Sequence, residues 1–153
     1  MVRRAPDVRA GLQTPVGPVW VEGTDAVTAV GWGEAPPASG DLLSEATAQI
    51  GAYFAGTRES FDLPLDLGTG FRARFRQALV DIPYGQTRTY GELARDLGVS
   101  AQAVGQACGA NPLPILVPCH RVLGTGGLGG FSGGTGVETK VWLLKHEGGT
   151  LLI

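Results

Sequence analysis

Residues 71–110 constrain the fold more than any other part of the chain. Apolar side chains recur at helical spacing over 71–82, and a Pro-Tyr-Gly turn follows them. The four residues from Thr89 have the pattern of a capping box, which begins a short helix that Gly98 ends. Ser100 can cap the next helix. Two short helices joined by a few residues that include glycine predict a helix-turn-helix.

The preceding residues predict a different kind of unit. Residues 16–21 and 27–32 have the composition of two strands joined as a hairpin, and apolar spacing predicts a helix over 42–54 that ends at Gly56. Residues 61–67 alternate apolar with polar or proline residues, which indicates an edge strand or an extended linker.

The fold class that follows is α/β (α+β), in two domains. We expect a small N-terminal domain over residues 1–69, with a β-hairpin or sheet and a helix. A mostly helical C-terminal domain over residues 70–153 is expected to hold the helix-turn-helix, a cysteine segment, a glycine-rich loop over 124–136 and a last helix over 139–146.

Composition restricts the class of protein. Hydrophobic content of 43% and charged content of 17% are those of a folded domain, and neither a secretory signal nor a membrane span is expected. Two cysteines provide no disulfide framework, so we expect a reduced, cytoplasmic compartment. Residues 1–70 carry a net charge of −5 and residues 71–153 carry +3, so a polyanionic partner would meet the second half.

The segment Pro118-Cys119-His120-Arg121 follows an apolar run and carries the candidate chemistry. Only the thiolate form of a cysteine is a strong nucleophile, and a neighbouring imidazole can remove the thiol proton while a guanidinium favours the anion. The alternative is an inert buried thiol. The spacing of the cysteines and histidines does not favour a zinc site, because it contains neither a C-x2-C nor an H-x3-H pair.

The second helix of the predicted helix-turn-helix has an unusual outer face for a DNA reader. Residues 101–110 contain no Lys or Arg, and the outer face consists of Ala101, Gln102, Gly105 and Gln106. Such a slim face suits the minor groove of DNA better than the major groove. A core helix that packs closely through Ala and Gly explains the same residues equally well.

Taken together, these motifs resemble the O6-alkylguanine-DNA alkyltransferases, also called methylated-DNA–protein-cysteine methyltransferases. The resemblance is strongest over residues 71–149. It rests on the motifs at 82–94, 103–105, 111–112, 118–122 and 142–148.

The resemblance implies repair of DNA by one irreversible transfer. An alkylated guanine is flipped out of the duplex, and its O6-alkyl group moves to the cysteine. By this resemblance Cys119 is the nucleophile and acceptor, His120 is the general base, Glu147 orients His120, and Tyr90 hydrogen-bonds the flipped base. A bridging water between the thiol and His120 is expected, since adjacent side chains diverge. No cofactor and no metal are implied.

The resemblance also implies residues that contact the substrate or the DNA. They are Ala101, Gln102, Gly105, Asn111, Arg121, Val122, Phe131, Ser132 and Lys140. Asn111 matches a residue that holds a tight turn. Gln102 departs from the family, which usually has an inserting Arg there, so we expect weaker DNA binding or slower repair than with arginine.

Two other functions compete with this interpretation. A sensor of alkylated bases would bind without transfer, although such relatives commonly have Trp in place of the cysteine. A cysteine hydrolase would use Cys119 and His120, but no oxyanion-hole signature is present. The expected partner is double-stranded DNA containing alkylated guanine, bound by a monomer located with the nucleoid. The sequence leaves open whether binding is cooperative and whether O4-alkylthymine is also a substrate.

Overall fold

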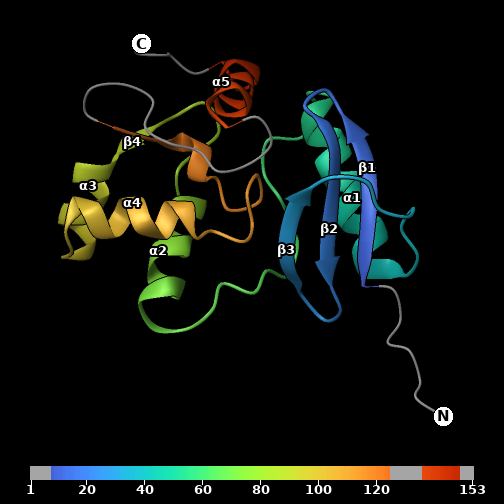
Figure 1. Cartoon of the computed structure of the whole chain (residues 1–153), viewed down its shortest axis with the longest axis horizontal. Helices are drawn as coiled ribbons and strands as arrows, with labels where there is room; N and C mark the ends of the chain where they lie inside the picture. Colours follow the sequence, from blue (N-terminus) through green and yellow to red (C-terminus); the bar gives the residue numbers. More distant parts are fainter. Residues whose placement is uncertain (1–7, 125–135, 149–153) are drawn as a thin grey trace. The chain divides into compact units, whose positions relative to one another are not determined.

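The computed structural model describes residues 8–124 and 136–148. The chain divides into two compact units, Met1–Asp66 and Leu67–Ile153. Figure 1 shows a sheet and a helix in the first unit and mainly helices in the second. The predicted α+β class is therefore confirmed, with strands gathered in the N-terminal unit and helices in the C-terminal one.

The first unit contains a three-stranded antiparallel sheet in the order β1 (Arg9–Thr14), β2 (Gly17–Gly23) and β3 (Val27–Trp32). Strands β2 and β3 confirm the predicted hairpin, in which Val21 faces Val30 across the register. Both of these side chains are buried, as expected for the inner face of a half-buried sheet.

Strand β1 was not predicted from the sequence. Within it only Ala10 is fully buried, and its glycine and polar residues weaken the alternation that marks a strand. It pairs with β2 across a two-residue turn, and its Gly11 also contacts the backbone of residues 35–36. The Gly11 amide donates to the carbonyl of Pro36 at 2.7 Å, and a Cβ at Gly11 would lie 2.6 Å from the carbonyl oxygen of Ala35. Only glycine lets the two segments approach this closely.

Helix α1 (Asp41–Phe54) covers the sheet and confirms the helix predicted over 42–54. Gly56 follows its end with φ 82°, a conformation that suits glycine. The buried face of α1 comprises Leu43, Ala46, Gln49, Ile50, Tyr53 and Phe54.

The stretch over 61–67 is an extended linker that touches the sheet at one point. Val27 donates its amide to Pro64 at 2.8 Å and accepts from the Asp66 amide at 2.9 Å. Gln49, buried on α1, holds the start of this stretch through both backbone groups of Asp62, at 2.9 and 3.0 Å. A single bridge is too little pairing to form an edge strand.

The second unit contains α2 (Gly70–Val80), α3 (Tyr90–Leu97), α4 (Ala101–Gly109) and α5 (Val137–His146). The predicted helix-turn-helix is α3 and α4. Both bonds of the capping box are present at Thr89, Gly98 ends α3 with φ 70°, and the Ser100 hydroxyl accepts from the Ala103 amide at 3.0 Å. Local residue preferences therefore agree with the tertiary structure here.

Two very short strands join distant parts of this unit. Strands β4 (Arg88–Thr89) and β5 (Val122–Leu123) pair in parallel, and β5 directly follows a 3-10 turn over Cys119–Arg121. Two-residue strands leave no periodic signal in the sequence. Their pairing connects the backbone just before α3 to the backbone just after the cysteine segment.

The interior of the second unit is formed by side chains from all four helices and from the segment after α4. They include Phe75, Leu79, Ile82, Leu93, Val104, Leu113, Leu116, Val117, Leu143 and Leu144. Phe71, Leu97 and Val141 belong to the same helices but are only partly buried. Among the described residues, no helix has the length and apolar character needed to cross a membrane.

Candidate active site

A tight turn after α4 carries the chain to the cysteine. The Asn111 side chain holds this turn from inside, donating to the Val117 carbonyl at 2.9 Å and accepting from the Leu113 amide at 3.0 Å. Ile115, at the middle of the turn, has φ 74° although it is β-branched and buried. The Cys119 amide then donates to the Val117 carbonyl at 2.7 Å, so the thiol has a fixed place.

The thiol of Cys119 is poorly exposed, at 7% for the residue. Burial raises its pKa, while a hydrogen bond with Asn111 and the positive charge of Lys140 act in the opposite direction. The thiol is therefore protonated at neutral pH and needs a base to become a nucleophile. The other cysteine, Cys108, is also buried, and burial together with Cys119 raises its pKa to about 12.

Glu147, directly after α5, faces the imidazole of His120. The distance from His120 Nε2 to Glu147 Oε2 is 2.7 Å, and both side chains are buried. Burial alone would raise the pKa of Glu147, but hydrogen bonds from His120 and Arg121 outweigh it and lower the pKa well below its usual value. An ionised carboxylate can only accept hydrogen bonds, so Nε2 of His120 must carry the hydrogen.

The other ring nitrogen of His120 is then unprotonated. Burial lowers the pKa of His120, although Glu147 opposes this effect, so the imidazole is neutral at pH 7. Its Nδ1 is buried and has no hydrogen-bond partner within residues 8–124 and 136–148. A neutral imidazole whose Nε2 is held by a carboxylate can accept a proton only at Nδ1.

Arg121 was predicted to contact the substrate or the DNA, but the structure places its side chain inside the protein. Its guanidinium is buried and donates to both carboxylate oxygens of Glu147, at 2.8 and 2.9 Å, and to the Ile82 carbonyl at 2.7 Å. This bidentate pair fixes the carboxylate that faces His120. Arg121 therefore acts inside the protein, because all of these bonds would have to break before it could reach DNA.

Lys140 and Val122 line the same interior region. Lys140 lies on α5, has no exposed surface, and donates from Nζ to the Val122 carbonyl at 2.6 Å. Burial lowers the pKa of Lys140, while the neighbouring Cys108 and Cys119 raise it. A buried ammonium near two thiols favours their ionised forms.

The remaining predicted residues lie on the helix-turn-helix or outside the described residues. Tyr90 is the first residue of α3 and is partly buried beside the β4–β5 pair. Ala101 and Gln102 are exposed at the start of α4, and among the described residues a Cβ added at Gly105 would meet no neighbouring element within 4 Å. Phe131 and Ser132 lie outside the described residues.

Sequence reasoning missed two backbone groups that help to hold Glu147. The carbonyl of Ile82 accepts from Arg121, and the Gly85 amide donates to Glu147 Oε1 at 3.4 Å. Ile82 directly precedes the Pro-Tyr-Gly turn and Gly85 is its last residue, and the sequence predicted only a turn there. Nothing local signals that a turn will meet a carboxylate 62 residues away. The described residues contain no cluster of three or more His, Cys, Asp or Glu side chains suited to a metal.

Comparison with known proteins follows the division of the chain. Residues 8–67 match the ribonuclease-like domain of 6-O-methylguanine DNA methyltransferase, and residues 70–149 match its DNA binding domain. This chain belongs to the 6-O-methylguanine DNA methyltransferase family. All of the predicted site residues fall within the region that matches the family's DNA binding domain.

Relatives of this methyltransferase-family chain have two kinds of name. A methylated-DNA–protein-cysteine methyltransferase of Mycolicibacterium paratuberculosis is 43% identical, with 89% of each chain covered. A Thermus thermophilus protein named DNA base-flipping protein is 44% identical over 90% of this chain and 97% of its own. A crystal structure of Mycobacterium tuberculosis OGT in complex with DNA superposes with a TM-score of 0.80, at 42% identity and 91% coverage of both chains.

Proposed function

We propose that this chain repairs DNA by moving the alkyl group of O6-alkylguanine to Sγ of Cys119, once and irreversibly. The geometry that carries the proposal is the 2.7 Å contact of His120 Nε2 with Glu147, which leaves Nδ1 as the free base next to the cysteine in sequence. Membership of the methyltransferase family supports the same reaction.

The proton of the thiol is the first problem that the site must solve. Because adjacent side chains diverge, we propose that one water passes the Cys119 proton to Nδ1 of His120. The imidazolium that forms is stabilised by Glu147, whose ionised state Arg121 maintains. Lys140 favours the thiolate electrostatically.

Sγ then attacks the alkyl carbon in line with the C–O bond. A sulfur–carbon bond forms, the carbon–oxygen bond breaks, and its electron pair leaves with guanine. Tyr90 donates its hydroxyl proton to the departing guanine, and the proton on His120 returns to the tyrosine oxygen through water, so that the proton lost by the thiol is matched by one gained by guanine. The products are a thioether at Cys119 and unmodified guanine, which accounts for a single turnover.

Access to the base requires duplex DNA to be opened. We propose that α4 lies in the minor groove with Ala101 and Gly105 against the groove floor, and that Gln102 enters the space left by the flipped nucleotide. The partner is double-stranded DNA that contains alkylated guanine, met by a monomer in the cytoplasm at the nucleoid. The structure of a relative in complex with DNA supports this choice of partner.

Intact-mass measurement tests the proposed function. After incubation with a duplex that contains O6-methylguanine, the chain should gain the mass of one methylene unit. Cys119→Ser should gain nothing, whereas Cys108→Ser, which removes the other buried thiol, should gain the same mass as the unmodified chain. A gain that persists in Cys119→Ser would disprove the assigned acceptor.

A second candidate function is a sensor that flips alkylated bases and transfers nothing. The relative named DNA base-flipping protein, at 44% identity, favours it. The presence of Cys119 next to a base held by a carboxylate favours transfer instead. The same mass measurement separates the two, because a sensor binds the methylated duplex with no change in mass.

A further inference from the structure

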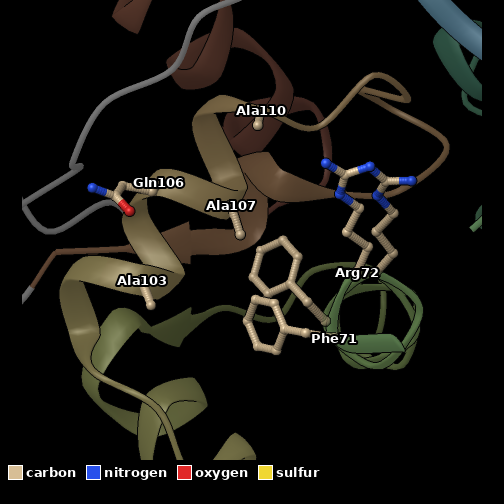
Figure 2. Close-up of a pocket in the computed structure, with 8 residues that line it drawn as sticks. Phe71, Arg72, Ala103, Gln106, Ala107 and Ala110 are labelled. Atoms are coloured by element: carbon tan, nitrogen blue, oxygen red, sulfur yellow. The ribbon is translucent and has the colours of Figure 1, made fainter. Parts of the chain in front are cut away.

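A cavity of about 540 Å³ opens between α2 and α4, away from the cysteine segment. Its walls are apolar where the two helices face each other, with Phe71 and Phe75 on α2 and Ala103 and Ala107 on α4. Figure 2 shows the Phe71 ring directed at the side of α4 that carries Ala103 and Ala107. The two phenylalanine rings are stacked, with centroids 6.0 Å apart.

Two arginines of α2 line the same cavity. Arg72 is exposed and Arg76 is partly exposed, and neither has an acidic partner within residues 8–124 and 136–148. In Figure 2 the Arg72 side chain extends from α2 toward the part of the chain near Ala110. The first turn of α2 contains no acidic residue, and the N-cap side chain of Thr69 makes no capping bond. Two unpaired guanidiniums at such a helix end favour an anion.

Three of the four other arginines of this unit are already engaged, and the fourth, Arg95 on α3, does not line the cavity. Arg74, on the same helix, donates to the Leu97 carbonyl at 3.1 Å, Arg88 pairs with Asp96 at 2.7 Å, and Arg121 is buried against Glu147. Helix α4 itself carries no Lys or Arg. If α4 enters DNA, positive charge for the adjacent phosphates must come from a neighbouring element.

The position of the cavity beside α4 indicates which kind of anion the cavity can bind. Each residue of an α-helix is rotated by about 100° from the one before it, so Ala103 lies on the flank beside the outer face of Gln102. A helix is about 10 Å across with its side chains, wider than the minor groove of about 6 Å, so its flanks meet the sugar–phosphate walls. The flank that carries Ala103 and Ala107 is the one that faces the cavity.

We infer that this cavity seats the sugar–phosphate backbone of one DNA strand, with phosphates on Arg72 and Arg76 and a deoxyribose against Phe71. The inference rests on the proposed function, and it assigns to α2 the charge that the α4 helix lacks. The apolar wall suits the C–H surface of the sugar, while the guanidiniums suit the bidentate geometry of phosphate. These contacts carry no sequence information, since every nucleotide has the same backbone.

The test is the salt dependence of binding to unmethylated duplex, compared between the unmodified chain and the double variant Arg72→Gln/Arg76→Gln. Each lost phosphate contact lowers the slope of log K against log salt by about 0.9, so the double variant should lose about 1.8. Affinity at low salt should fall about tenfold per arginine, equally for all sequences. An unchanged slope would overturn the inference.

Arg74→Gln is the matched control, because it removes the same charge from the same helix outside the cavity. It should leave the slope within about 0.3 of the original. The double variant Arg72→Lys/Arg76→Lys keeps both charges and should keep the slope. If Arg74→Gln lowers the slope as much as the loss of one cavity arginine does, the overall positive charge of α2 explains the effect. The cavity is then not the site that binds the DNA backbone.

Methyl transfer separates a failure of this inference from a failure of the proposed function. If the unmodified chain gains a methyl from methylated duplex but the double variant keeps the original slope, only the cavity assignment is wrong. If the unmodified chain gains no methyl, the proposed function fails. Melting curves of each variant show whether a lower slope of log K against log salt results from unfolding. If the double variant is unfolded, the single variant Arg72→Gln gives the change in slope for one phosphate contact in a folded chain.

Discussion

The cysteine segment and the outer face of α4 differ in how their polar groups are satisfied. Around Glu147 the charged groups are buried and joined to one another, with hydrogen bonds of 2.7–2.9 Å to His120 and Arg121. On the outer face of α4, Ala101, Gln102 and Gln106 are exposed, and the nearby Arg72 and Arg76 have no acidic partner among the described residues. Chemistry requires groups fixed before the substrate arrives, whereas DNA binding requires groups whose partners arrive with the DNA.

The largest effect should come from Glu147→Gln, which removes the charge that joins His120 and Arg121. Breaking a buried ion pair leaves a guanidinium without its counter-charge and costs about 3–5 kcal/mol of unfolding free energy. Methyl transfer by the folded fraction should slow about 10²-fold or more, because the imidazolium loses its stabilisation. Denaturant unfolding and single-turnover rates measure the two effects.

Glu138→Gln is the control for this change, since it removes an exposed acid from the first turn of α5, the helix that Glu147 directly follows. It should change the unfolding free energy by less than about 1 kcal/mol and leave transfer alone. Equal losses of unfolding free energy and transfer rate in the two variants would mean that the buried carboxylate contributes no more than an exposed one.

The pH dependence of transfer shows whether the base acts within the folded site. Burial lowers the pKa of His120 from 6.5 and raises that of Cys119 from 9.0. His120 therefore remains an unprotonated base below pH 6.5, and the thiol keeps its proton above pH 9, so the rate should be flat between these values. A rate that climbs about tenfold for each pH unit would mean that the thiolate forms without His120.

The next effect concerns the DNA side of the comparison. Gln102→Arg adds a charge at an exposed position near the start of α4 and should raise the transfer rate on duplex DNA about tenfold or less. The stability of the chain should not change, since Gln102 makes no contact with the buried cluster. Single-turnover rates on methylated duplex measure the gain, and no change or a slower rate counts against the predicted insertion of residue 102.

The smallest effect should come from Thr89→Ala, which removes the capping box of α3. The unfolding free energy should fall by about 1 kcal/mol. Ser100→Ala removes a single side-chain cap bond from α4 and should cost no more than Thr89→Ala. Both variants should transfer methyl at the original rate per folded molecule, and a much slower rate would mean that the caps also position the active site.

The sequence predicted those features that depend on local residue preferences. The capping residues Thr89 and Ser100, the stop at Gly98 and the β2–β3 hairpin are each specified by neighbouring residues, and all are confirmed. Strand β1 was missed although its partner β2 follows after two residues, because its glycine and polar residues weaken the alternation that marks a strand. The β4–β5 pair was missed because its two strands are distant in sequence.

The candidate site likewise contains residues that could be predicted and residues that could not. Resemblance to a family identified Cys119, His120 and Glu147 as a group, and the structure places His120 against Glu147. It did not identify the partner of Arg121, because a lone arginine after a histidine is equally compatible with a DNA contact and a buried ion pair. The cavity arginines lie on a helix whose sequence gives no sign of which element will pack opposite it.

Ile115 has a consequence for how far the cysteine motif can be transferred to other proteins. A buried β-branched residue at φ 74° adopts a conformation that its own chemistry disfavours, at a cost of about 1–3 kcal/mol. The surrounding interior must therefore impose the path that leads to the sulfur. Grafted alone into an unrelated scaffold, the residues from Asn111 to Arg121 would relax into another path and leave the thiol wherever that path ends.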